Sequence, residues 1–319
     1  SLHDALPISQ IEAIHKENGG KHTAVNLGIE HSEGEFIACL DADSFVDPDA
    51  LKRMMTYFIQ DPEIMAVSPS VLVHNPKTII QKAQKADYTM AAYIKKMFAS
   101  VNGMHVASGS FTVFRREVFE KIGMYRNAHN TEDFEITLRM YANGMRIDQC
   151  NDAYVYTVAP SSIRKLFKQR LRWMFGFIEN LKEYRFMIFR KQYGPLGMIT
   201  LPAGVISMLG VVYLFLMVLV RVGRKIADMI LYYRDTGAVQ MPTLHFDWFF
   251  FNTGSTFFLL AILYLMVTIS FLLGKKMYGK RARLSIDLLY FLTIYSVVAP
   301  LWLLRAMYNS VARVRTAWR

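Results

Sequence analysis

Short apolar runs alternate with stretches of helical period between Glu12 and Tyr193. The run Phe36–Leu40, FIACL, is continuously apolar, which is typical of a strand covered on both faces. Alternation of such strands with amphipathic helices predicts an α/β domain. Further strands are expected at Ile64–Val67, at Ser70–Val73, within Ser108–Gly123, at Met145–Asp148 and at Tyr154–Thr157. Helices are expected at His22–His31, Leu51–Ile59 and Thr78–Phe98, after Thr131, and at Ser161–Phe189.

The pattern changes near Gly194 and Pro195, where long apolar segments separated by basic clusters begin. Crossing a bilayer takes roughly 20 apolar residues, and three segments are long enough. These are Leu196–Val220, Phe249–Leu273 and Leu284–Leu304. The segment Lys275–Arg283, KKMYGKRAR, is typical of a cytoplasmic loop. We therefore expect a multi-pass protein of the cell (inner) membrane with its α/β domain in the cytoplasm.

The third apolar segment conflicts with the rule that positive loops stay inside. If Leu284–Leu304 crossed the membrane, Arg313, Arg315 and Arg319 would lie outside. Either this segment is re-entrant or interfacial, or further chain follows Arg319. The sequence leaves both alternatives open, so we expect two to three spans.

The composition agrees with a membrane-attached protein rather than a nucleic-acid-binding one. Hydrophobic residues make up 53% of the 319 residues, and the formal net charge is +11. Lysines and arginines gather beside the apolar segments, where anionic lipid headgroups explain them, and no nucleic-acid motif accompanies them. The two cysteines, Cys39 and Cys150, are too few for a disulfide framework or a zinc site.

The first nine residues, SLHDALPIS, do not fit this organisation. They show no signal-peptide pattern and do not lead into a first strand. We expect 1–9 to be non-native and the chain to be a fragment. The expected division is then an α/β domain in 10–160 that lacks its first strand, an amphipathic interfacial helix region in 161–194, and a transmembrane region in 195–319.

Two carboxylates, Asp41 and Asp43, follow the apolar run Phe36–Leu40 directly. Ligands of open α/β sheets gather at the carboxyl ends of strands. Neighbouring carboxylates are most easily tolerated around a hard divalent cation that also binds a phosphate. For a lone DxD sequence, an acidic strand-to-helix turn is the commoner explanation. Asp47 is expected to cap the next helix, with Pro48 at its first position.

Lys21 lies at the predicted start of a helix, after the turn Gly19–Gly20. The positive end of the helix dipole disfavours a cation there unless an anion is also present. Lys21 is therefore a candidate phosphate ligand, and a solvated lysine is the ordinary alternative.

Two short polar segments offer further candidates. Ser108–Ser110 is a loop of small residues that lets a ligand approach the backbone, although a tight turn explains it as well. In Thr131–Asp133, the threonine suits an N-cap and the two acids suit the first helical turn. Helix capping alone explains these three residues.

The long basic helix contains KQRLRWMFG, in which Gln169, Arg172 and Trp173 share one face because of their i, i+3, i+4 spacing. Tryptophan offers a flat apolar platform to a sugar ring, and arginine a forked donor to phosphate oxygens. A basic interfacial helix with its tryptophan at the headgroup level explains the same residues without catalysis. The motif alone leaves both interpretations open.

In this order, DAD at Asp41–Asp43, SGSF at Ser108–Phe111, TED at Thr131–Asp133 and QRLRW at Gln169–Trp173 resemble the family 2 membrane glycosyltransferases. These are processive β-glycan synthases of the cellulose, chitin and poly-N-acetylglucosamine type. GGKHTAVNLGI, 19–29, also resembles that family's Gly-Lys segment. The resemblance implies a GT-A-like, Rossmann-like domain, followed by an interfacial helix and transmembrane helices.

The resemblance also implies an activity, namely inverting transfer of a sugar from a UDP-sugar to a growing β-linked polysaccharide. Asp133 would be the general base, and Mg²⁺ or Mn²⁺ would bind at Asp41 and Asp43. Donor contacts would come from Lys21, Asp41, Gln169 and Arg172, and acceptor contacts from Ser108, Gly109, Glu132 and Trp173. The implied partners are the UDP-sugar donor, the glycan acceptor, the lipid bilayer and an accessory membrane subunit. Nucleic acid is not an implied partner.

The sequence departs from the family before Glu12, where an acidic uridine-contacting segment and preceding membrane helices are expected. An inactive remnant or a non-catalytic membrane scaffold is therefore the alternative. Haloacid-dehalogenase-type phosphatases also begin with a strand ending in DxD, but Phe45 stands where that family has Thr or Val. TED instead of a GDD-like triplet, with Arg170 in QRLRW, is closer to poly-N-acetylglucosamine and cellulose-type synthases. N-acetylglucosamine is the expected sugar.

Overall fold

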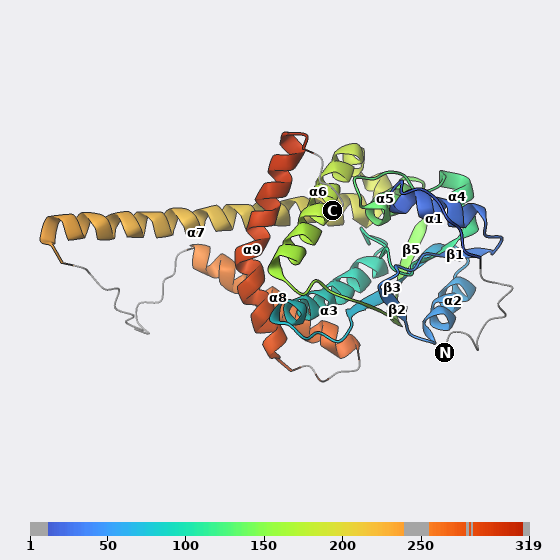
Figure 1. Cartoon of the computed structure of the whole chain (residues 1–319), viewed down its shortest axis with the longest axis horizontal. Coiled ribbons are helices and arrows are strands. Elements are labelled where there is room, and N and C mark those ends of the chain that lie inside the picture. The colour runs from blue at the N-terminus through green and yellow to red at the C-terminus, as the bar shows by residue number, and fades with distance from the viewer. Residues whose placement is uncertain (1–11, 239–254, 279–280, 282, 315–319) are drawn as a thin grey trace.

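The computed structural model describes residues 12–238, 255–278, 281 and 283–314. The segment 1–9, the start of Phe249–Leu273, parts of Lys275–Arg283, and Arg315 and Arg319 lie outside the described residues. The described part contains one mixed β-sheet with helices on both faces, and long apolar helices beside it (Figure 1).

The sheet has five strands in the order β1-β4-β3-β5-β2. Their bounds are β1 Phe36–Ala38, β2 Ser44–Val46, β3 Ile64–Val73, β4 Val113–Arg115 and β5 Arg146–Thr157. Strands β3 and β5 are parallel, whereas β1 pairs with β4, β4 with β3, and β2 with β5 in antiparallel orientation. The predicted α/β class is confirmed, with more antiparallel pairing than the motif pattern alone indicates.

Two pairs of predicted strands are each one continuous strand. Ile64–Val67 and Ser70–Val73 both belong to β3, and β5 likewise joins its two predicted pieces. A register shift between β3 and β5 follows Pro69. Because proline lacks the N–H that a ladder needs, it commonly marks such irregularities.

Strand β1 is shorter than the apolar run Phe36–Leu40, and the prediction that it is covered on both faces was wrong. Within the described sheet β1 pairs with β4 alone. Ala38 is exposed, and Leu40 is 45% exposed. An apolar run shows that a segment can be buried, but the strand's place in the sheet decides how much of it is.

Helices cover both faces of the sheet. One face carries α1 Lys21–Glu30, α4 Arg116–Ile122 and α5 Glu132–Ala142, and the other carries α2 Ala50–Gln60. Ile136 of α5 packs in a core that includes Ala66 and Phe114, while Met54 of α2 packs with Val67 on the opposite side. Successive strand residues point to opposite faces, so each strand serves both cores.

The start of helix α2 differs from the predicted cap at Asp47 and first helical position at Pro48. Its N-cap position is Asp49, not Asp47, and Pro48 lies in the turn before it. The Asp47 carboxylate instead accepts a hydrogen bond from the Asp49 N–H at 3.2 Å. Asp can hold such a local turn as well as a helix start, and here the extra strand β2 shifts the helix forward.

The next helices connect the sheet with the apolar part of the chain. They are α3 Ile79–Ser100, α6 Ile163–Glu183, α7 Leu201–Thr236, α8 Ser255–Met277 and α9 Ile286–Val311. Thr78 and Gln81 form a capping box at the start of α3. Helix α6 ends earlier than predicted, and short turns of helix follow at Arg185–Met187 (η3), Lys191–Tyr193 (η4) and Leu196–Thr200 (η5). The domain core continues through Leu196 to Leu201.

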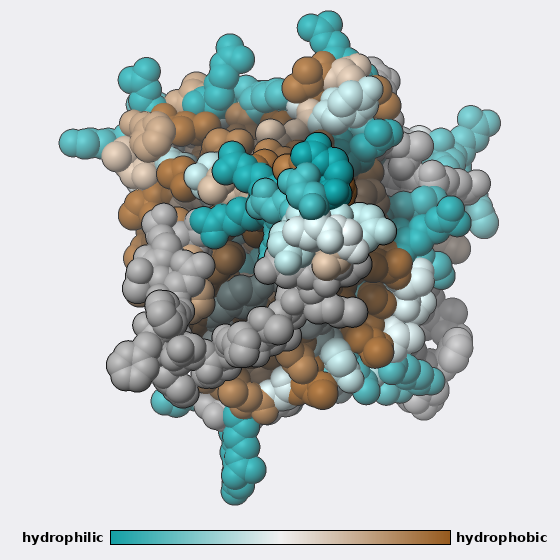
Figure 2. Space-filling model, turned by 90° about the vertical axis from the view of Figure 1, so that its left-hand side faces the viewer, coloured by the Kyte–Doolittle hydropathy of each residue, from teal (hydrophilic) through white to brown (hydrophobic). Residues whose placement is uncertain are grey.

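Within the described ranges, three helices are long and apolar enough to cross a membrane. These are Leu196–Thr236, which includes α7, Phe257–Met277 in α8, and Ile286–Val311, which is α9. Helix α7 projects away from the domain, whereas α9 runs along its side (Figure 1) and packs on α3 and α6. The side toward which α7 projects exposes many apolar side chains (Figure 2).

Helix α5 is held tightly at both ends of its buried face. Glu135 pairs with Arg139 at 3.1 Å and accepts a hydrogen bond from the Tyr184 hydroxyl at 2.7 Å. Arg139 also donates to the backbone oxygens of Ile122 and Met124 at 2.8 and 2.9 Å. A buried ion pair needs further hydrogen bonds to offset its lost hydration. These bonds attach α5 to the end of α4 and to Tyr184 at the end of α6, while Arg139 Nε has no hydrogen-bond partner among the described residues.

Thr131 occupies the N-cap position of α5, as predicted, but its side chain does not cap the helix. Its hydroxyl donates to the backbone oxygen of Ala128 at 3.0 Å and accepts from Asn180 of α6 at 2.9 Å. Gly176 of α6 lies so close that a Cβ there would overlap the Thr131 side chain. The start of α5 is therefore fixed by packing against α6.

Gly176→Ala should destabilise the protein by about 1–3 kcal/mol, the usual cost of overpacking a buried contact. The matched control is Gly28→Ala in α1, where an added Cβ meets nothing within 4 Å. That variant should gain up to about 1 kcal/mol, since alanine is the better helix former. Thermal unfolding of the purified protein measures both, and equal midpoints for the two variants would contradict the packing described.

Candidate active site

Antiparallel pairing of β1 with β4 brings two of the sequence motifs together. Ala38 at the end of β1 lies opposite Val113 at the start of β4. The loop that leaves β1 carries DAD, and the loop that enters β4 carries SGSF. The N–H of Phe111 donates to the backbone oxygen of Cys39 at 2.7 Å, which joins the two loops.

Lys21, at the start of α1, pairs with one carboxylate from the loop after β1 and one from the start of α5. Its Nζ lies 2.7 Å from Asp41 Oδ1 and 3.2 Å from Glu132 Oε1. Asp41 also accepts a hydrogen bond from the Ser110 hydroxyl at 2.6 Å. Burial alone would lower the pKa of Lys21, but Glu132 and Asp41 raise it above its usual value. Lys21 therefore stays charged and is not the solvated lysine of the ordinary alternative.

Asp43, the second acid of DAD, is more exposed and more loosely held. Its carboxylate has the Ser44 hydroxyl at 3.5 Å, and that hydroxyl also lies 3.4 Å from the hydroxyl of Ser110. Two carboxylates and two hydroxyls are the hard oxygen donors that Mg²⁺ or Mn²⁺ prefers, so the residues fit such an ion. Among the described residues no group of three or more His, Cys, Asp or Glu side chains is arranged to hold a metal ion by itself. A divalent ion would therefore share its coordination with a ligand's phosphates.

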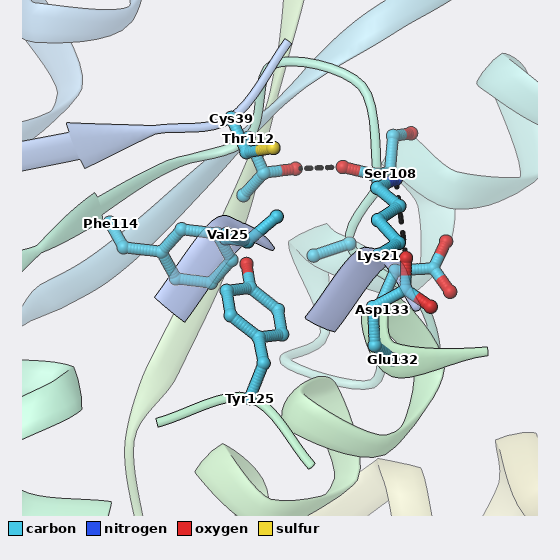
Figure 3. Close-up of a pocket in the computed structure, with 11 residues that line it drawn as sticks. Lys21, Val25, Cys39, Ser108, Thr112, Phe114, Tyr125, Glu132 and Asp133 are labelled. Carbon is cyan, nitrogen blue, oxygen red and sulfur yellow. Dashed lines mark hydrogen bonds and ion pairs between the residues drawn. The ribbon is translucent and has the colours of Figure 1, made fainter. Parts of the chain in front are cut away.

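The SGSF loop packs directly on the first turn of α5. A Cβ added at Gly109 would lie 3.2 Å from Asp133 Oδ2, so a larger residue would press on this carboxylate. The Ala107 N–H donates to the Thr137 hydroxyl at 2.9 Å, and that hydroxyl donates to the Asp133 backbone oxygen at 2.6 Å. The loop and the helix thus form one unit, and Ser108, Gly109, Glu132 and Asp133 line one pocket with Lys21 (Figure 3).

Opposing effects act on the Asp133 carboxyl. Burial and the neighbouring Glu132 raise its pKa, while Lys21, the Phe134 N–H and Lys95 lower it, and the net effect is a pKa above the usual carboxyl value. Its position in the first helical turn favours the ionised form. Removal from water outweighs that preference, because a buried carboxylate loses its hydration.

The sequence did not single out Lys95, which lies on α3 behind the SGSF loop. Its Nζ donates to the Ser108 hydroxyl at 2.7 Å. Burial lowers the pKa of Lys95 to about 8, although Asp133 acts in the opposite direction. In the sequence Lys95 is one of several lysines on an amphipathic helix, and only the packing of α3 under the loop distinguishes it.

The QRLRW motif lies on α6, near the DAD loop but not in the same pocket. Charges of both regions act on Tyr88 of α3. Burial raises the pKa of the Tyr88 phenol, and the nearby Arg170 lowers it. Three carboxylates raise this pKa further, namely Asp87, Asp43 and Asp41. The Oε1 of Gln169 is buried and has no hydrogen-bond partner within the described residues. Trp173 stacks with Arg170, whose guanidinium lies 4.4 Å from its ring centroid.

Comparison with known sequences gives a family for this arrangement. The family model described as "Glycosyltransferase like family 2" matches residues 2–176. Poly-β-1,6-N-acetyl-D-glucosamine synthase of Staphylococcus aureus (strain COL) is 30% identical over 183 residues, which is 54% of this chain and 44% of the relative. The Staphylococcus epidermidis enzyme of the same name is 30% identical over 160 residues, 50% of this chain and 39% of the relative. The chain therefore spans less than half the length of these curated relatives.

Comparison with solved structures agrees on the fold. A mannosyltransferase from Pyrobaculum calidifontis, PcManGT, solved in complex with GDP-Man and Mn²⁺, superposes with a TM-score of 0.54. It is 16% identical, and the match covers 93% of this chain and 68% of that one. The fold is GT-A-like, as the sequence motifs predicted. Since the family model matches more than half of the chain and the fold agrees, this chain belongs to glycosyltransferase family 2.

Proposed function

We propose that this glycosyltransferase transfers N-acetylglucosamine from a UDP-sugar to a growing β-linked polysaccharide, with inversion at the anomeric carbon. The observation that carries the proposal is the pocket lined by Asp133, Lys21 and Glu132, in which Lys21 pairs with Glu132 and also with Asp41 of the DAD loop. This arrangement supports the assignment of Asp133 as the base beside a diphosphate site at Lys21 and Asp41. The 30% sequence identity with a poly-β-1,6-N-acetyl-D-glucosamine synthase supports the choice of sugar.

On the donor side, Lys21 is a charged ammonium group held in place by two carboxylates. A diphosphate that enters between Lys21 and Asp41 would take over part of this pairing. Asp41 and Asp43 would hold Mg²⁺ or Mn²⁺, and the Mn²⁺ in the mannosyltransferase of similar fold supports this assignment. Such an ion would offset the negative charge that develops on the leaving diphosphate. Gln169, with its unpartnered buried oxygen, and Arg172 would bind the donor from α6.

On the acceptor side, Asp133 would take the proton of the attacking hydroxyl. That oxygen forms the new bond to the anomeric carbon while the bond to the UDP oxygen breaks on the opposite face, which inverts the configuration. A base works best when its pKa approaches the working pH. The pKa of Asp133 is raised above the usual carboxyl value and is therefore shifted toward neutral pH. Ser108, Gly109, Glu132 and Trp173 would position the acceptor.

The membrane placement belongs to the same proposal. The catalytic domain would lie at the cytoplasmic face of the inner membrane, because the basic residues around Lys275 and Lys276 favour that side. An accessory membrane subunit would complete the assembly. An inactive remnant remains the alternative, and measured transfer by the purified protein decides between the two.

Asp133→Asn should lower the transfer rate by about 10²–10⁴-fold, the usual contribution of a general base. The folded protein should persist, because a carboxyl whose pKa is raised by folding destabilises the protein above that pKa, and asparagine removes this effect. Polymer synthesis is measured at equal amounts of folded protein, with UDP binding as a second measurement. The matched control is Glu132→Gln, which should lose less activity. If Asp133→Asn transferred sugar at the wild-type rate, Asp133 would have a purely structural role.

The transfer rate should rise with pH along an acid limb set by Asp133. Because the base acts when deprotonated and its pKa is raised, this limb should lie above the ordinary carboxyl range of about 4. Lys95→Met removes a cation that lowers the pKa of Asp133, so the limb should move to still higher pH. The control is Lys96→Met, because Lys96 is the neighbouring lysine and pairs with Asp148. A limb that moves equally in both variants would exclude this electrostatic role of Lys95.

UDP binding should depend on a divalent metal, and Asp43→Ala should remove that dependence. We expect Mn²⁺ to tighten UDP binding in the wild type, and this effect to fall by at least about tenfold in the variant. Isothermal titration with and without Mn²⁺ measures it. The control is Asp49→Ala, which removes an exposed acid of the same region that pairs with Arg53. Metal-independent binding by the wild type would contradict the assignment.

A further inference from the structure

Arg170 of α6 is enclosed by groups from three helices. Its guanidinium pairs with Asp87 of α3 at 2.6 Å and lies 4.4 Å from the ring centroid of Trp173. The rings of Tyr88 in α3 and Tyr295 in α9 follow at 5.9 and 5.8 Å. Only 12% of its side chain is exposed, although this arginine of QRLRW carries no assigned role.

This placement differs from that of the other basic residues at the start of α6. Lys165 and Lys168 are exposed, as expected of residues that meet lipid headgroups. A buried guanidinium loses its hydration and is tolerated only with good partners. Here one carboxylate and three aromatic faces supply them. Lipid attachment by α6 explains the lysines but not an arginine turned inward.

The contacts of Arg170 restrict the indole of Trp173. A guanidinium stacked on an aromatic ring is a planar group on a planar group, so it favours one ring orientation. Arg170 is itself fixed, because Asp87 holds it and the Tyr295 hydroxyl donates to the same Asp87 oxygen at 3.2 Å. The chain of contacts therefore runs from α9 through Asp87 and Arg170 to Trp173.

We propose that Arg170 is a positioning residue that holds the Trp173 indole in one orientation and links it, through Asp87 and Tyr295, to the packing of α9. The effect of Arg170 on acceptor binding rests on the proposed function, in which Trp173 binds the acceptor. An acceptor sugar that stacks on an indole already fixed loses less conformational freedom on binding. Acceptor affinity would then depend on Arg170 although Arg170 does not touch the sugar.

The first measurement reads the indole orientation without any substrate. The protein is labelled with 5-fluorotryptophan, and the Trp173 ¹⁹F resonance is assigned with Trp173→Phe. Arg170→Lys keeps the charge but removes the planar stack, so it should shift or broaden this resonance. Tyr295→Phe removes one hydroxyl and should shift it less. Lys168→Met, on the same helix, should leave it unchanged.

The second measurement separates acceptor binding from chemistry, with a soluble N-acetylglucosamine pentasaccharide as the acceptor. Arg170→Lys should raise the acceptor KM by about tenfold, because an indole that is no longer fixed must be ordered when the sugar binds. The kcat value and the Kd of UDP should stay within about twofold of the wild type. The wild-type protein, restored from the variant by the reverse substitution, is the reference for expression and folding.

Each outcome decides the inference. An unchanged Trp173 resonance in Arg170→Lys overturns the positioning role, and a changed resonance with an unchanged acceptor KM overturns its link to acceptor binding. Equal losses of kcat, KM and UDP binding would assign Arg170 to structure only. If Arg170→Lys does not fold, Tyr295→Phe decides by the same two measurements. If the wild type transfers no sugar, the proposed function fails, while the ¹⁹F result still tests the positioning of Trp173.

Discussion

The ammonium group of Lys21 holds together two acidic loops that electrostatic repulsion would otherwise separate. Asp41 follows a strand and Glu132 starts a helix, and both carboxylates lie within 3.2 Å of the same nitrogen. Opposite unit charges 4 Å apart attract by about 4 kcal/mol at an effective dielectric constant of 20. Without this cation, Asp43 and Asp133 would add two further negative charges to an uncompensated cluster. The candidate site depends on this arrangement before any ligand arrives.

The second requirement is a rigid support for Asp133. Helix α5 is attached to its neighbours by the buried pair of Glu135 and Arg139 and by the close contact between Thr131 and Gly176. The SGSF loop then packs on its first turn without room for a side chain at Gly109. A carboxylate held this firmly is removed from water by its surroundings, which is why its pKa rises although a helix start would favour its ionised form.

Helix α3 connects the candidate site with the apolar helices. It presents Lys95 to the SGSF loop, and it presents Asp87 and Tyr88 to α6 and α9. Ala86 and Met90, on another side of the same helix, pack with Phe271 of α8 and Leu288 of α9. A single long helix therefore contacts the SGSF loop of the candidate site, the QRLRW motif and the apolar region. This geometry relates the membrane part to the catalytic part through packing rather than through a linker.

The sequence alone determined the class of the domain, the order of its motifs and most of its helices, because apolar periodicity and capping residues are local properties. Thr78, Gly123 and the acids after Thr131 are examples. It also identified Lys21, Asp41 and Asp133 as candidates, since their types and positions follow from chemistry that recurs at strand and helix ends. The sequence did not reveal that Asp49, not Asp47, precedes α2, or that β1 is exposed at one edge. Nor did it reveal the roles of Lys95 and Arg170. Those features depend on which element packs against which, and burial and partner charges exist only after segments far apart in the chain have come together.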